Sequence, residues 1–321
     1  MTSEKTQVVT DEYALYLGDC VDLIDVLPDE SVGLSVFSPP FPGMYAYTDS
    51  PRDMGNVRDI DEMLAQFRFY VEKSLRVHQP GRMVCCHLTQ VPTFKYLEGY
   101  VGLKDFRGKT ISLYEDCGWI YYGEVLIDKD PQVKAVRTKD ASLAFKSLAT
   151  DSARMRPCLA DYLLLFKKHG DNVTPIKAGA SDRYGNDNGW ITNDEWINWA
   201  QPVWYRQRPE LPGGIRETDV LTARPAKDAA DEKHLCPLQL GVIERAVKLW
   251  SAPGETVLSP FMGIGSEGHQ AVRFGRKFVG FELKPSYFEQ AVQYIEQGAF
   301  ERRQDGADLL SFAADQARGW A

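Results

Sequence analysis

The chain has 321 residues, of which 44% are hydrophobic and 26% are charged. These fractions are close to those of soluble globular proteins, so we expect one large or two ordinary domains around a substantial core. The first residues lack the basic and apolar segments of a signal peptide, and no apolar stretch is long enough to span a bilayer. The six cysteines show no Cys-x-x-Cys spacing. Composition therefore predicts a cytoplasmic protein with reduced thiols, without a membrane segment and without a metal site.

The formal net charge of −8 argues weakly against nucleic-acid binding, because contact with phosphates needs a basic surface. The charge is nevertheless uneven. From Lys129 to Lys168 there are nine basic and four acidic side chains, a local charge of +5. Taken alone, this cluster indicates a solvated surface somewhat more than a binding site. Charge therefore does not decide whether the protein binds nucleic acid.

Strand and helix signals alternate over the first part of the chain. Short apolar runs at 13–17, 32–37 and 83–86 predict buried strands. Between the first two, 21–27 predicts a short helix. The periodic apolar residues of 60–75, preceded by Asp59 as the capping residue, predict a longer helix that Pro80-Gly81 ends. This βαβαβ order is typical of a parallel sheet covered by helices.

Between residues 121 and 225 this alternation is lost. One clear strand is predicted at 162–166, and Thr192 with Glu195 forms a capping box that opens a short helix. Prolines and glycines at 209–214 indicate a loop or linker. We interpret this region as an insertion or a small second domain, whose core would contain its tryptophans: Trp190, Trp196, Trp199 and Trp204.

Regular signals resume towards the end of the chain. A helix is predicted at 238–250, a strand at 255–259, a glycine-rich turn at 260–268 and a helix at 269–274. They are followed by a strand at 277–282, a helix at 286–297, and a peripheral tail or helix at 301–321.

The glycine-rich turn carries the sequence Gly263-Ile-Gly265-Ser-Glu-Gly268, and Glu282 ends the next strand. Glycines between a strand and a helix let the backbone approach a ligand closely, and an acid at the next strand end can accept hydrogen bonds from ribose hydroxyls. The pattern therefore predicts a cofactor that contains adenosine. It does not by itself separate NAD from S-adenosylmethionine, although a dinucleotide fold needs a second mononucleotide half, for which little chain remains.

A second motif, Ser38-Pro39-Pro40-Phe41, directly follows a predicted buried strand. Two prolines remove two backbone donors and fix φ, which leaves carbonyls free to accept hydrogen bonds. Methylation of an amine in an extruded base needs such acceptors and an aromatic face for stacking. Taken alone, Ser-Pro-Pro is a common turn.

The two motifs gain weight from their position in the fold. If the last strands pair with the first ones, the strands that end near Asp19, Ser38, Ser259 and Glu282 all finish at one edge of a parallel sheet, where ligands bind in such folds. The prediction is an α/β fold with a circularly permuted, Rossmann-like methyltransferase sheet.

At this point the sequence resembles the β class of DNA amino-methyltransferases, in which the catalytic loop comes first and the cofactor motif last. The matching segments are 15–20, 27–31, 38–41, 233–237, 259–265 and 280–282. The resemblance implies a catalytic and cofactor-binding domain formed by 1–120 and 226–321, with a target-recognition region at 121–225.

The resemblance also implies individual roles. Ser38, Pro39, Pro40 and Phe41 would hold and stack the target base. The cofactor-binding residues would be Asp19 near the adenine, Glu282 at the ribose, Ser259 towards the cofactor's amino group, Phe261, Gly263 and Gly265 along the methionine and adenosine parts, and His234 and Pro237 at the methionine end. Two positions depart from the family pattern, which usually has Asp where this chain has Ser259 and Thr where it has Glu267.

We therefore expect a site-specific enzyme that transfers a methyl group from S-adenosylmethionine to the N6 amine of adenine or the N4 amine of cytosine in double-stranded DNA by base flipping. The sequence does not decide which of the two bases is methylated. The mechanism needs no metal and no cysteine nucleophile, so Cys85, Cys86, His87 and His269 are interpreted as packing residues. The 42–58 loop, which contains Met44, Tyr45, Tyr47 and Arg52, is a candidate for closing over the site.

Homodimers occur among relatives, so a homodimer is expected by analogy alone. Three alternatives remain at this stage: an RNA methyltransferase, an NAD(P)-dependent oxidoreductase, and a DNA-binding protein without catalytic activity.

Overall fold

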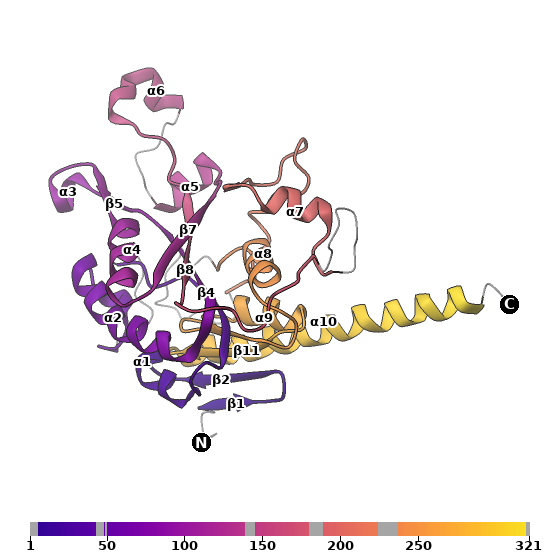
Figure 1. Ribbon diagram of the computed structural model, residues 1–321. Helices are drawn as coiled ribbons and strands as arrows, with labels where there is room; N and C mark the ends of the chain where they lie inside the picture. The colour runs from indigo at the N-terminus through magenta and orange to yellow at the C-terminus, as the bar shows by residue number, and fades with distance from the viewer. Residues whose placement is uncertain are drawn as a thin grey trace.

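The computed structural model describes residues 6–42, 48, 50–138, 145–179, 189–223 and 237–318. They form a large β-sheet with helices on both of its faces (Figure 1). Among the described helices, none has the length and apolar character needed to cross a membrane.

The main sheet contains nine described strands, in the order β1-β2-β11-β10-β3-β4-β8-β7-β9. Neighbouring strands from β2 to β4 are parallel, while β1 and β8 run antiparallel to their neighbours. The strands that come last in the chain therefore lie between those that come first, which confirms the predicted permuted order. Their bounds are β1 (Gln7–Val9), β2 (Tyr13–Leu17), β3 (Val32–Phe37), β4 (His78–Thr89), β7 (Ile120–Ile127), β8 (Asp161–Lys167), β9 (Val203–Trp204), β10 (Thr256–Ser259) and β11 (Lys277–Glu282).

Each face of the sheet is covered by its own set of helices and its own hydrophobic core. On one face, α8 (Leu240–Trp250), α9 (Ser266–Arg273) and α10 (Pro285–Arg318) bury their apolar side chains against the sheet. On the other face, α1 (Cys20–Leu23), α2 (Ile60–Val77) and α4 (Phe106–Asp116) do the same. The sheet is thus a buried middle layer, and its loops at the carboxyl ends of the parallel strands are left to form a site.

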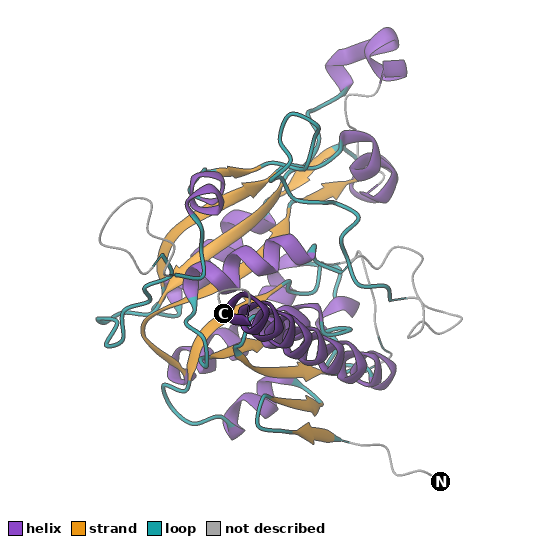
Figure 2. Ribbon diagram, turned by 90° about the vertical axis from the view of Figure 1, so that its right-hand side faces the viewer, coloured by secondary structure: helices purple, strands orange, loops and turns teal. Residues whose placement is uncertain are grey.

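Shorter elements connect or decorate these layers. They are η1 (Ile24–Val26), η2 (Met54–Asn56), β5 (Val91–Thr93), α3 (Lys95–Glu98), β6 (Gly102–Lys104), α5 (Pro131–Thr138), α6 (Phe145–Asp151), η3 (Ser152–Arg154) and α7 (Asn193–Trp199). Both ribbon views show that α6 projects from the body of the protein (Figures 1 and 2). In Figure 1 the far half of α10 also extends beyond the body.

Several predicted bounds agree closely with the structure. The strands expected at 13–17, 32–37 and 277–282 are β2, β3 and β11, and Asp59 caps α2 by accepting from the amides of Asp61 and Glu62. Thr192 and Glu195 form the predicted capping box of α7. The expected tail at 301–321 is helical as far as Arg318, because α10 continues through it.

One predicted boundary was wrong. Pro80-Gly81 does not end α2, which stops at Val77; it lies inside β4, which starts at His78. The pairing of β3 with β4 is irregular at this point, since Val32 pairs with His78 and Leu34 with Met83. This irregularity lets the strand include a proline, which cannot donate to the ladder, and a glycine with φ of 74°.

The region predicted as an insertion contributes strands to the main sheet. β8 pairs with β4, and β7 pairs with β8, both antiparallel. A boundary at residue 121 would therefore cut through β7. Antiparallel strands do not give a βαβ rhythm, which explains why the sequence pattern is lost there. Trp204, expected in a separate small core, is buried in the core shared with α8.

Candidate active site

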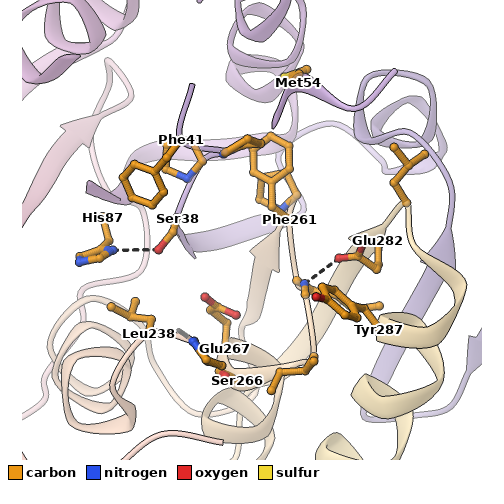
Figure 3. A pocket seen from close by; sticks show the side chains of 18 of the residues that line it. Ser38, Phe41, Met54, His87, Leu238, Phe261, Ser266, Glu267, Glu282 and Tyr287 are labelled. Carbon is orange, nitrogen blue, oxygen red and sulfur yellow. Dashed lines mark hydrogen bonds between the residues drawn. The ribbon is translucent and has the colours of Figure 1, made fainter. Parts of the chain in front are cut away.

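A cavity opens at the carboxyl edge of the sheet, where the parallel strands end. The loops after β2, β3, β10 and β11 all contribute to its wall, together with the end of β4 (Figure 3). The predicted residues that line it are Asp19, Ser38, Pro39, Pro40, Phe41, Pro237, Phe261, Gly263 and Glu282. The parallel register thus brings together motifs that are more than 200 residues apart in sequence.

The glycine-rich turn is held by the acid at the end of β11. The amide of Gly263 donates to Oε2 of Glu282 at 2.8 Å, and the amide of Lys284 donates to Oε1 at 2.8 Å. Gly263 has φ of 53°, and a Cβ added there would meet no atom within 4 Å. A ligand can therefore approach the backbone closely at this point.

Gly265, predicted to contact the cofactor, precedes α9 as its N-cap residue. It is not among the residues that line the cavity. Its φ is 91°, and a Cβ would lie 3.0 Å from the backbone of Ala291 in α10. Gly265 therefore lets α9 pack closely on α10, and contact with a ligand is left to Gly263, Ile264, Ser266 and Glu267, which do line the cavity.

Two carboxyl groups of the cavity wall, those of Glu267 and Glu282, have raised pKa values. Burial raises the pKa of Glu267 to about 8 and that of Glu282 to about 7. The side chain of Glu267 lies in the cavity between Ser38 and the glycine-rich turn (Figure 3). A cationic ligand would stabilise the ionised form of either group.

Asp19 is fixed by two contacts at the end of β2. Its carboxylate accepts from the amide of Val21, as the N-cap of α1, and pairs with Arg52 at 3.1 Å. Arg52 and Met54 of the 42–58 loop also line the cavity. Met44, Tyr45 and Tyr47 lie outside the described residues, as does His234.

Ser259 is not in the cavity wall. It is fully buried below the turn, and its hydroxyl has no hydrogen-bond partner in the described structure. The sequence therefore placed Ser259 correctly at the end of β10, while its side chain does not reach the space where a ligand would bind.

Aromatic contacts fix the two phenylalanines of the site. The ring of Phe41 packs edge-on against Phe106 of α4, with centroids 6.2 Å apart. Phe261 contacts Phe37 and Phe67, each with centroids 5.9 Å apart. Both rings are thus held by the core beneath, so neither loop is free to collapse into the cavity.

Ser38 begins a chain of hydrogen bonds that sequence reasoning missed. Its Oγ lies 2.8 Å from Nδ1 of His87, and Nε2 of His87 lies 3.2 Å from Oδ2 of Asp161. Asp161 also pairs with Lys129, at 2.8 Å, and with Lys134. All of these residues line the cavity, so His87, interpreted from the sequence as a packing residue, borders the candidate site.

These contacts set the protonation states. Burial acts to raise the pKa of Asp161, but Lys129, Lys134 and His87 outweigh it and hold the pKa well below its usual range. Burial lowers the pKa of His87, the two lysines lower it further, and Asp161 partly offsets both. Asp161 is therefore ionised and His87 neutral at pH 7. Lys129 and Lys134 belong to the basic cluster of the sequence, yet they serve this network rather than an open surface.

Comparison with known proteins decides the family. The model of the N6/N4 methyltransferase family, described as DNA methylase, matches residues 32–293. The chain belongs to this family of DNA methylases. It is therefore a DNA amino-methyltransferase that uses S-adenosylmethionine, and the oxidoreductase alternative is not favoured.

The individual relatives are distant. The chain is 23% identical over 302 residues to the type II methyltransferase M.MjaI of Methanocaldococcus jannaschii, covering 87% of this chain and 89% of the relative. It is 26% identical over 150 residues to M.BglI of Bacillus subtilis, of which it spans 34%.

Two solved structures share the fold of the methylase. One is a proposed DNA modification methylase from Thermus thermophilus in complex with S-adenosyl-L-methionine, with a TM-score of 0.61 and 18% identity, covering 90% of this chain and 96% of that one. The other is the cytosine-N4-specific PvuII DNA methyltransferase, with a TM-score of 0.60 and 15% identity, covering 92% and 93% of the two chains.

The cavity of the methylase fits S-adenosylmethionine in three respects. Gly263 leaves room for close approach, and Glu282 stands beside it at the end of β11. Ser266 lines the cavity, and its hydroxyl is buried without a hydrogen-bond partner in the described structure. Glu267 adds a carboxyl group that suits a cation. A base amine could enter from the opposite wall, at Ser38.

Proposed function

We propose that the methylase recognises a specific site in double-stranded DNA, flips out an adenine or a cytosine, and methylates its exocyclic amine. The observation that carries this proposal is that Ser38-Pro39-Pro40-Phe41 shares one cavity with Gly263 and Glu282. Acceptors for an amine and a site for an adenosine-containing methyl donor thus face each other. A base inside a duplex cannot reach such a cavity, so the base must leave the stack.

In this proposal S-adenosylmethionine supplies the electrophilic methyl group. Ser38 and the carbonyl of Pro39 accept hydrogen bonds from the amine and aim its lone pair at the methyl carbon. The ring of Phe41, held by Phe106, stacks on the base. Glu282 and Asp19 hold the ribose and adenine parts, and Pro237 adjoins the methionine part. Orientation supplies most of the rate enhancement, because two bound reactants are held in line.

Target recognition is assigned to 121–225, with one amendment. β7 and β8 belong to the catalytic sheet, so recognition falls to the connections on either side of β8, including the projecting α6 (Figure 2). The proposal includes a homodimer, which rests on analogy with relatives. It also includes a cytoplasmic location, in keeping with the free thiols of the described cysteines.

Expression in a host that lacks DNA methylation, followed by base-resolved sequencing, tests the proposal. We expect one methylated base type within one recurring sequence, and its identity decides between adenine and cytosine. Ser38→Ala should reduce methylation at least about 100-fold, which is typical for loss of a transition-state hydrogen bond.

Ser35→Ala is the matched control, since Ser35 also hydrogen-bonds a histidine, His78, but does not line the cavity. Folded protein that leaves host DNA unmethylated would contradict the proposal. Methylation of RNA and not DNA would favour the RNA alternative, and DNA binding that Ser38→Ala leaves unchanged, without methyl transfer, would favour the non-catalytic one.

A further inference from the structure

The hydrogen-bond chain from Ser38 runs through four separate elements. Ser38 follows β3, His87 lies in β4, Asp161 begins β8, and Lys129 follows β7. Each of the last three is at most 9% exposed. Lys129 also donates to Oε1 of Gln239, the residue that precedes α8, at 2.9 Å. Buried charges are costly unless they are paired, so this convergence needs an explanation beyond packing.

The order of acceptors fixes the state of the imidazole. Asp161 is ionised and can only accept, so Nε2 of His87 carries the hydrogen and donates to it. Nδ1 is then bare and accepts from the hydroxyl of Ser38. Because the Ser38 hydrogen is directed to His87, the lone pairs of its oxygen are left for a donor in the cavity, such as the amine of a base.

A second Ser–His pair, between Ser35 of β3 and His78 of β4, differs from the first in the partner of its histidine. His78 lies 2.9 Å from the hydroxyl of Ser35, and its other nitrogen lies 2.7 Å from the carbonyl oxygen of Ser74. Burial lowers the pKa of His78 to about 4. No carboxylate faces it among the hydrogen bonds of the described residues. A carbonyl cannot stabilise an imidazolium as a carboxylate can, so Ser35–His78 is suited to structure and Ser38–His87–Asp161 to proton transfer.

We propose that His87, oriented by Asp161, keeps Ser38 as a hydrogen-bond acceptor for the target amine and takes up the proton that this amine loses. This deepens the proposed function and rests on it. When the N–CH3 bond has formed, the nitrogen carries a positive charge and one proton too many. That proton passes to Oγ of Ser38 as the hydroxyl proton of Ser38 passes to Nδ1 of His87. The imidazolium is paired with Asp161, which stays ionised, and later releases its proton to solvent.

Lys129 and Lys134 influence the pH range in which His87 can take up a proton. The charged groups that face His87 are Asp161 from β8, Lys129 from the loop after β7, and Lys134 from α5, and Glu267 lies across the cavity. One carboxylate between two ammonium groups is bound too tightly to take the proton itself. The carboxylate of Asp161 nevertheless stabilises an imidazolium beside it more than a site without a carboxylate would. His87 can therefore accept a proton transiently and is neutral again before the next turnover.

Single-turnover methylation of a duplex carrying the site found by sequencing tests this role. His87→Asn keeps an acceptor near the position of Nδ1 but cannot take up a proton, and His87→Phe removes both functions. We expect the rate constant to fall about 100-fold in His87→Asn and further in His87→Phe, the range typical of acid–base catalysis. Affinity for S-adenosylhomocysteine and for DNA should change by no more than about twofold, since neither substitution removes uniform binding.

The pH profile separates proton uptake from a structural role. In the wild type the rate should fall at low pH as His87 becomes protonated, below the usual histidine range. This acidic limb should be absent in His87→Asn, while acid limbs caused by Glu267 or Glu282 would persist in both. His78→Asn is the matched control, and we expect it to lower stability while its folded fraction keeps the wild-type profile.

Wild-type rates and an unchanged acidic limb in His87→Asn would overturn the proposal. If that variant does not fold, nitrogen NMR of labelled histidines in the wild-type protein decides, with His87 assigned from His87→Gln. Hydrogen on Nε2 supports the proposal, and hydrogen on Nδ1 contradicts it. A wild-type protein that methylates no DNA would instead refute the proposed function, so the two failures are distinct.

Discussion

The buried carboxyl group of Glu267 leads us to predict that binding of S-adenosylmethionine depends on pH. It lies in the first turn of α9, is 6% exposed, and faces the cavity without a hydrogen bond from a described side chain. With a pKa of about 8, it is mostly protonated at pH 7. A cation such as S-adenosylmethionine favours the carboxylate, so binding should release a proton and become tighter as the pH rises from about 6.5 to 8.5.

Calorimetry in buffers of different ionisation enthalpy measures this release. Glu282 has a pKa of about 7 and can also release a proton, so the difference between the wild type and Glu267→Gln is the informative quantity. We expect Glu267→Gln to release fewer protons and to bind S-adenosylmethionine more weakly above pH 7.5. Equal proton release in both proteins would show that Glu267 does not face the cofactor's charge.

At the scale of single residues, the sequence predicted those site residues that belong to a short local motif. Ser38 and Glu282 could be predicted because a proline pair and a strand-ending acid are visible in the sequence. His87 and Asp161 could not, since they are 49 and 74 residues from their partners. The register did hold a signal: Phe37 pairs with Cys86, so the next residues of the two parallel strands adjoin.

Gly265 carries a prediction at the scale of elements, because it sets the distance between α9 and α10. Gly265→Ala introduces a Cβ at positive φ and 3.0 Å from the backbone of Ala291. Backbone strain alone costs about 1–3 kcal/mol, and the clash adds to it. We expect lower stability by chemical denaturation and weaker binding of S-adenosylhomocysteine, since α9 carries Ser266 and Glu267.

Gly275, directly after α9, is the matched control. Its φ is 76°, but a Cβ there would meet no atom within 4 Å. Gly275→Ala should therefore show the strain without the clash, and cofactor affinity should stay unchanged. If the two variants lost the same stability and the same affinity, close packing of α9 on α10 would not be what positions the turn.

Elements were predictable where the pattern was local. Periodicity and capping residues were enough for α2, β2, β3 and β11. They gave 83–86 as a strand but missed the start of β4, because Pro80-Gly81 breaks a helix and a strand ladder alike, and only the pairing with β3 shows which element contains it. The strand at 162–166 was predicted and is β8, but β7 was missed, and the pairing of both strands depends on tertiary structure.

At the scale of the whole molecule, strands from both ends of the chain build one sheet, so their pairing does not follow their order in the sequence. β10, from the end of the sequence, pairs with β3, from its beginning. The permuted order was predictable because both motifs must meet at one sheet edge. The extent of the recognition region was not, because a separate region and an antiparallel extension of the sheet give similar sequence patterns.

This independence predicts that the chain can be permuted again. Arg303 of α10 pairs with Glu12, just before β2, at 3.5 Å. The amide of Leu17 donates to the carbonyl of Thr6 at the far end of β2, so joining residue 305 to residue 6 takes a flexible linker of about ten residues, which reaches roughly 30 Å. A protein with the order 226–305, linker, 6–225 should fold, bind S-adenosylhomocysteine and methylate the same DNA sequence as the wild type.

The unpermuted chain 6–305 is its control, because both proteins lack the same terminal residues. In the parallel core, each strand is held by its register with its neighbours and by the helices of both faces, and none of these contacts requires a particular chain end. Stability within about 2 kcal/mol of the control and an unchanged target sequence would support this view. If the control were active and the permuted protein folded without binding cofactor, the connection between residues 225 and 226 would itself hold part of the cofactor site together.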